Sequence, residues 1–209
     1  MTPASQQALE VLRSTENFQW YVIPLFVFVI YVYVAEIAAR NWSAVQLGAG
    51  MWAAELMAEQ VNALILTATG RSALWTTPGD SAYVIYAGLN IEIAFMFMIS
   101  GLMIVKLLPG DRDLKILGVP NRLFIPLAFG LLACTVEVLL NFAGVLVWEY
   151  AFWSWPHVYL VLFVYTAPWM LLVRVHDRWS PRAKQRAALL LPAAAILSHL
   201  IFATGLGWI

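Results

Sequence analysis

Six long apolar stretches dominate this sequence and limit what it can fold into. Each is close to the roughly 20 residues that an α-helix needs to cross the hydrocarbon core of a bilayer. They cover about residues 18–38, 49–69, 82–105, 123–148, 156–174 and 187–207. The chain has 209 residues, is 62% hydrophobic and only 11% charged, which is far from the composition of soluble domains. We therefore predict an all-α fold, with residues 1–209 forming a single membrane domain of six transmembrane helices.

The basic residues predict the orientation of this bundle. The two ends of the chain and the second and fourth connections hold only Arg13 and Arg71. The other side holds ten basic residues, namely Arg40, Lys106, Arg112, Lys115, Arg122, Arg174, Arg178, Arg182, Lys184 and Arg186. Positively charged loops stay in the cytoplasm, so both termini are expected on the non-cytoplasmic side. The short loops favour a multi-pass protein of the bacterial inner (plasma) membrane.

Charge, cysteine content and tryptophan positions narrow the classes of function and site. The formal net charge is zero, which gives no support for a nucleic-acid partner. A single cysteine, Cys134, excludes an internal disulfide and a cysteine-rich metal site. Tryptophans near the ends of the spans are expected to anchor the helices at the membrane interfaces. At the outer interface we expect Trp20, Trp75, Trp153, Trp155 and Trp208, and at the inner one Trp42 and Trp179.

The segment ELMAEQVN, inside the second span, carries an unusual polar stripe. Glu55, Glu59 and Asn62 are spaced so that all three fall on one face of a helix. An acidic residue at the centre of a membrane helix opposes insertion by about 2.5–3.5 kcal/mol on the translocon scale. The stripe therefore predicts a polar cavity facing the inside of the bundle, with Glu59 near the membrane midplane and Glu55 nearer the cytoplasm.

Three other spans bring polar residues to a similar depth. Depth in the membrane can be counted at about 1.5 Å of rise per residue. The third span then places Asn90 and Glu92 in the outer half of the membrane. The fourth span places Glu137 and Asn141 in the middle and outer half. The sixth span brings His199 to a similar level. Such agreement between four helices predicts one shared cavity, built from spans 2, 3, 4 and 6.

The predicted helix faces refine this site. On the third span, Tyr83, Tyr86 and Asn90 would share a face, while Glu92 would point about 200° away from Asn90. Both cannot face the cavity, so Asn90 is expected to serve a helix contact. On the fourth span one stripe holds Gly130, Cys134, Glu137, Asn141, Gly144 and Trp148, and its small residues would allow close approach of another helix or a ligand.

Buried glutamic acids without a cationic partner tend to stay protonated, and no lysine or arginine lies in the middle of any span. Aromatic faces lining the same cavity would stabilise cations, and the residues expected there are Trp52, Tyr83, Tyr86, Trp148, Tyr165 and Trp169. This combination suits protonation of an alkene or epoxide followed by deprotonation of the carbocation. The predicted catalytic residues are Glu59, Glu137, Glu92 and His199. The predicted substrate-binding residues are Asn62, Asn90, Asn141, Trp52, Tyr86, Trp148 and Glu55.

The substrate expected from this chemistry is an isoprenoid or other membrane lipid, and no cofactor is expected. The layout, and the layout alone, resembles that of small multi-pass terpene cyclases and sterol isomerases. No diagnostic motif of either family occurs, so no residue role is carried over.

Three alternative functions use the same side chains. The acids could serve a proton- or cation-coupled transporter or channel, or bind a lipid or partner helix in a non-catalytic subunit. A carboxylate-bridged metal site is disfavoured because no Glu-x-x-His motif is present. Oligomerisation stays open.

Overall fold

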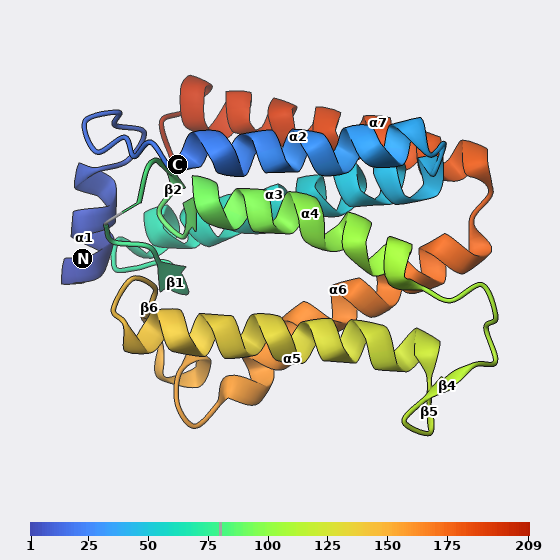
Figure 1. Cartoon of the computed structure of the whole chain (residues 1–209). Coiled ribbons are helices and arrows are strands. Elements are labelled where there is room, and N and C mark those ends of the chain that lie inside the picture. The colour runs from blue at the N-terminus through green and yellow to red at the C-terminus, as the bar shows by residue number, and fades with distance from the viewer. Residues whose placement is uncertain (80) are drawn as a thin grey trace.

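The computed structural model describes residues 1–79 and 81–209, and they form a mainly helical bundle (Figure 1). The helices are α1 (Pro3–Glu10), α2 (Val22–Ala38), α3 (Trp42–Thr69), α4 (Ile91–Leu107), α5 (Asn121–Phe142), α6 (Val158–Arg178) and α7 (Pro181–His199). A π-helical turn, Leu200–Gly205, continues α7. Among the described residues, three helices are long and apolar enough to cross a membrane: Asn121–Phe142, Val158–Arg178 and Pro181–Gly205. The predicted helical, membrane-embedded class is thus confirmed.

Short antiparallel strand pairs close the two ends of the bundle. The pairs are β1 (Trp75–Thr76) with β6 (Val147–Trp148), β2 (Val84–Tyr86) with β3 (Leu89–Asn90), and β4 (Lys115–Ile116) with β5 (Val119–Pro120). A 3-10 turn, Ala151–Trp153, follows β6. The first two pairs lie at the end that also carries α1 and both termini, while β4 and β5 lie at the opposite end (Figure 1).

The helices form two groups. Helix α3 packs against α4 and α7, with α2 beside α4, while α5 and α6 pack on each other as a separate pair (Figure 1). Glycines allow close packing in the α3–α4 and α5–α6 contacts. A Cβ at Gly101 of α4 would lie 2.8 Å from the Met51 Cβ of α3. A Cβ at Gly130 of α5 would lie 2.1 Å from the Thr166 Oγ1 of α6. The expected close approach of another helix at Gly130 is therefore confirmed.

Two helix boundaries differ from the sequence prediction. The third helix starts at Ile91 and not near residue 82, because the Asn90 side chain caps it by accepting the Ile93 N–H at 2.9 Å. The prediction that Tyr83, Tyr86 and Asn90 share a helix face is wrong, since they lie in the β2–β3 region before the helix. Helix α5 ends at Phe142, and residues 143–148 lead away from it.

The end of α5 has a simple local cause. Gly144 adopts φ +74°, a left-handed conformation that ends helices and favours glycine. Trp148, predicted to continue the helical stripe, therefore lies in β6 and pairs with Trp75. This pairing brings the connection after α5 against the connection after α3, at the end of the bundle that carries α1 and both termini.

The α2–α3, α4–α5 and α6–α7 connections lie at the end of the bundle away from the termini (Figure 1), and they carry ion pairs. Arg122 Nε lies 3.0 Å from Asp177 Oδ2, and Lys106 pairs with Glu36. The ten basic residues counted above belong to these three connections or the adjoining helix ends. An apolar core that includes Leu47, Leu102 and Leu172 lies between this end and the centre of the bundle.

Candidate functional site

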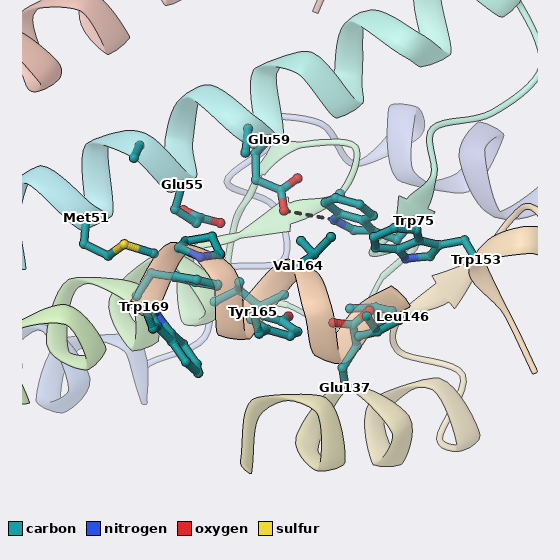
Figure 2. A pocket seen from close by; sticks show the side chains of 17 residues that line it. Met51, Glu55, Glu59, Trp75, Glu137, Leu146, Trp153, Val164, Tyr165 and Trp169 are labelled. Carbon is teal, nitrogen blue, oxygen red and sulfur yellow. Dashed lines mark hydrogen bonds between the residues drawn. The ribbon is translucent and has the colours of Figure 1, made fainter. Parts of the chain in front are cut away.

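A cavity of about 150 Å³ lies between α3, α4 and the α5–α6 pair (Figure 2). Its polar lining comes from three carboxyl groups, and its remaining lining is largely aromatic and aliphatic. Glu55 and Glu59 project from α3, and Glu137 projects from α5 on the other side (Figure 2). The aromatic lining residues are Trp75, Phe97, Trp153, Tyr165 and Trp169. We call this space the acidic cavity.

Glu59 is fixed by a network that also fastens the segment after α3. Its Oε1 accepts the Trp75 Nε1–H at 2.9 Å, and its Oε2 accepts an Asn62 N–H at 3.4 Å. Asn62, only 1% exposed, also donates to the Trp75 carbonyl at 3.0 Å and accepts the Leu74 N–H at 2.8 Å. Asn62 thus positions Glu59 and the start of β1 together.

Glu137 has a matching arrangement on the opposite wall. It is 6% exposed, and its Oε1 accepts the Trp148 Nε1–H at 2.7 Å. One turn further along α5, Asn141 donates to the Leu146 carbonyl at 3.0 Å, which secures the connection toward β6. Asn62 touches its acid directly, whereas Asn141 acts on the backbone that carries Trp148.

Glu55 differs from the other two acids. It is 7% exposed, and neither carboxyl oxygen has a hydrogen-bond partner among the described residues. A buried polar group without a partner is unfavourable by about 1–3 kcal/mol. Glu55 lines the same cavity as Glu59, one turn away on α3.

The aromatic wall agrees with the prediction only in part. Tyr165 and Trp169 of α6 line the cavity as expected, with ring centroids 5.7 Å apart. Trp75 and Trp153, which stack at 5.2 Å, were not expected there. The expectation that Trp75 and Trp153 anchor the outer interface is wrong, because both are folded inward against the acidic cavity (Figure 2). Trp148 holds Glu137 from outside this lining, and Trp52 likewise does not line it.

The β2–β3 turn covers Glu59, and Gly88 is the residue that makes this possible. A Cβ at Gly88 would lie 2.2 Å from the Asn62 Nδ2, 2.8 Å from the Glu59 Oε2 and 2.9 Å from the Trp75 Cδ1. Only a residue without a side chain permits so close an approach. The sequence analysis did not identify Gly88, although a glycine before an Asn helix cap is a turn signal.

Glu92 and Asn90 lie outside the acidic cavity. The Glu92 carboxylate accepts the Ser81 hydroxyl at 2.7 Å and the Ala82 N–H at 2.9 Å, and it also accepts the Tyr21 hydroxyl. Glu92 thus ties the first turn of α4 to neighbouring segments.

His199 and Tyr86 form a second polar cluster, between α3 and α7. The Tyr86 hydroxyl lies 2.7 Å from His199 Nδ1 and accepts the Gln60 N–H at 2.9 Å. Gln60 also donates to the Ala195 carbonyl at 2.9 Å and accepts the Ser198 hydroxyl. Neither His199 nor Tyr86 lines the acidic cavity. Gln60, next to Glu59, was missed by the sequence analysis because it faces away from the Glu55–Glu59 stripe.

A more open apolar groove of about 370 Å³ adjoins the acidic cavity between α4 and α5. We call it the α4–α5 groove. The two spaces share six lining residues: Ile93, Phe97, Glu137, Leu146, Tyr165 and Trp169. Among the described residues, no group of three or more His, Cys, Asp or Glu side chains is arranged to hold a metal ion.

Comparison with known proteins places the chain in a family. Residues 2–204 match an uncharacterized membrane protein family. The chain belongs to that family. It is similar to an uncharacterized protein of the archaeon Archaeoglobus fulgidus, with 43% identity over 171 residues that cover 82% of this chain and 81% of the relative. No solved structure matches the chain. Together with the apolar helices, family membership establishes a multi-pass membrane location.

Proposed function

We propose that the protein is a membrane enzyme that carries out acid–base chemistry on an isoprenoid or similar lipophilic substrate. The observation that supports this most is the pair Glu59 and Glu137, which line opposite walls of one aromatic cavity and each accept an indole N–H. Catalysis by proton transfer requires a donor and an acceptor within reach of the reacting atoms. The two indoles and Asn62 provide that orientation.

In the proposed reaction one glutamic acid, in its neutral form, transfers a proton to a carbon of a substrate double bond. The carbocation that forms is stabilised by the faces of nearby rings such as Tyr165, Trp169 and Trp75. The other glutamate then removes a proton from a neighbouring carbon. The outcome is an isomerised or, after internal attack by a second double bond, a cyclised product, with no net gain or loss of atoms.

Glu55 has a supporting role in this proposal. Lying one turn before Glu59 on the same face of α3, it can accept the proton that must move between turnovers. Three of the residues predicted at the site bond to other parts of the fold: Glu92, Asn90 and His199. We propose that they hold the helices and strands around the cavity in place and do not contact the substrate.

Transport of protons or cations through the same carboxyl groups has less support. The apolar core containing Leu47, Leu102 and Leu172 separates the acidic cavity from the basic end of the molecule. A pathway across the membrane needs polar or open surfaces toward both sides. The α4–α5 groove opens sideways instead, which suits a ligand that arrives from the lipid phase.

For the membrane arrangement, we propose six spans formed by α2 to α7, with both termini outside the cytoplasm. The gathering of basic connections at one end of the bundle supports this orientation. The expected bacterial inner membrane gains no support from the relative found, which is archaeal. The proposal is therefore the plasma membrane of a prokaryotic cell.

The test compares lipid extracts of cells that produce the wild-type protein, Glu59→Gln or Glu137→Gln, analysed by mass spectrometry. Glu149→Gln is the matched control, because Glu149 accepts hydrogen bonds from Thr2, Ser5 and Thr76 at the outer end and does not line the acidic cavity. We expect an isoprenoid lipid to be converted by wild type and by Glu149→Gln but not by the other two. Equal lipid profiles in all four strains would contradict the proposal.

A further inference from the structure

The α4–α5 groove has a shape that the acidic cavity lacks. On α4 its lining runs from Ile93 to Met103, and on α5 from Phe129 to Leu140. At 1.5 Å of rise per residue, both stretches are roughly 15 Å long. The groove therefore follows the two helices lengthwise, and the acidic cavity joins it near Ile93 and Glu137. A long, narrow ligand would fit this outline better than a broad one.

The chemistry of the lining is as informative as its length. Apart from Glu137, Ser100 and the Tyr165 hydroxyl, the groove is lined by aliphatic, methionine and aromatic side chains. No lysine, arginine or histidine lines either the groove or the acidic cavity among the described residues. Phosphate and diphosphate groups are bound in proteins by such cations or by helix N-termini. An anionic head group would thus meet carboxyl groups and no counter-charge.

We propose that the groove and the acidic cavity together bind an uncharged, linear, unsaturated hydrocarbon chain. The body of the chain lies along α4 and α5, and its end enters the acidic cavity between Glu59 and Glu137. The part about the reacting end rests on the function proposed above, while the chain-binding site does not depend on it. The substrate class is accordingly a neutral polyprenyl chain, without a phosphate or diphosphate.

Adjacent residues of α5 provide a matched pair for the test. Leu132 lines the groove and is 61% exposed, whereas Leu131 does not line it and is 51% exposed. Leu132→Trp would fill part of the groove, and Leu131→Trp would place the same bulk on a lipid-facing surface. Met96→Trp, on the α4 side of the groove, is a second blocking variant in case Leu132→Trp does not fold.

The probe is an all-trans geranylgeraniol analogue that carries a diazirine at its tail end, photolysed with the purified full-length protein. We expect cross-links in α4, α5 and the acidic cavity. Excluding about two CH₂ groups from an apolar site lowers affinity about tenfold, so Leu132→Trp and Met96→Trp should reduce labelling by about that factor. Leu131→Trp should leave it unchanged. Unmodified geranylgeraniol should compete, and geranylgeranyl diphosphate should compete far less.

Two results would overturn the inference. The first is labelling that spreads evenly over the lipid-facing helices and is equally affected by both leucine variants. The second is competition by the diphosphate, or by a quaternary ammonium of the same chain length, that is stronger than competition by geranylgeraniol. The two measurements separate this inference from the proposed function, because labelling along α4 and α5 requires no proton transfer. If labelling follows expectation but lipid profiles do not respond to Glu137→Gln, the chain site stands and the acid–base function fails.

Discussion

Two indole N–H groups, from Trp75 and Trp148, meet two buried carboxyl groups on opposite sides of the same cavity. Each indole reaches its acid from a short strand, β1 or β6, and these strands pair with each other. The strand pair thus joins the two segments whose indoles hold Glu59 and Glu137. At the scale of residues, this connection is the feature on which the proposed chemistry depends.

Removing one indole donor should weaken both stability and activity. Trp148→Phe keeps the aromatic bulk but leaves the Glu137 Oε1 without its hydrogen bond, which destabilises the fold by about 1–3 kcal/mol. We expect a lower melting temperature, followed by intrinsic fluorescence, and reduced lipid conversion. Trp20→Phe is the control, because Trp20 is 79% exposed. Equal melting temperatures for the two variants would argue against a structural role of this bond.

Gly88→Ala should disturb the cover over Glu59. The added methyl group would overlap Asn62 and Glu59, and relieving such overpacking destabilises by about 1–3 kcal/mol. Gly110→Ala is the control, since a Cβ there meets nothing within 4 Å. Melting temperatures of the two purified variants provide the measurement. A wild-type value for Gly88→Ala would mean that the β2–β3 turn does not press on the acid.

The sequence predicted which residues of α3 share a face, but it did not predict which neighbours other side chains would meet. Glu55, Glu59 and Asn62 share a face because helical spacing fixes it. His199 lies on α7 but bonds to Tyr86 and not to the acids, because membrane depth says nothing about which neighbour a helix face meets. Trp75 and Trp153 were expected at the interface because tryptophans at span ends usually lie there, yet they fold inward with the strand pair.

At the scale of elements, the connection between α3 and α4 defines the outer side of the site. The run SAYVIYAGLN is apolar enough to extend a predicted span, but Gly88 and Asn90 turn it into a strand pair followed by a helix cap. Hydropathy detects burial in either case and cannot separate a buried strand pair from a helix. The α3 and α6 helices were predictable from length, while this connection required tertiary contacts.

Asn62 links this connection to α3, so its loss should loosen one element selectively. Asn62→Leu removes the bonds to the Leu74 N–H and the Trp75 carbonyl. We expect faster hydrogen–deuterium exchange at residues 74–77, with exchange in α5 unchanged. Asn17→Leu, in the exposed segment before α2, is the control. Uniform acceleration across all helices would indicate global destabilisation and contradict the proposed local role.

At the scale of the whole molecule, the uneven charge distribution predicts how the bundle sits in the membrane. With Cys134 replaced by Ala, single cysteines at Glu16 and Asp113 report on opposite ends, since both positions are exposed. A membrane-impermeant maleimide applied to intact cells should label Glu16→Cys and leave Asp113→Cys unlabelled until the cells are opened. Labelling of Asp113→Cys in intact cells would reverse the proposed orientation.

The central claim is proton transfer to and from carbon in the acidic cavity, and isotope incorporation tests it most directly. Membranes containing the protein are incubated in D₂O with the lipid whose conversion the extracts identify, and the product is analysed by mass spectrometry. Wild type should introduce a deuterium that does not wash out, bound to carbon, and folded Glu59→Gln and Glu137→Gln should introduce none. A product formed without carbon-bound deuterium, or incorporation unchanged in both variants, would contradict the account.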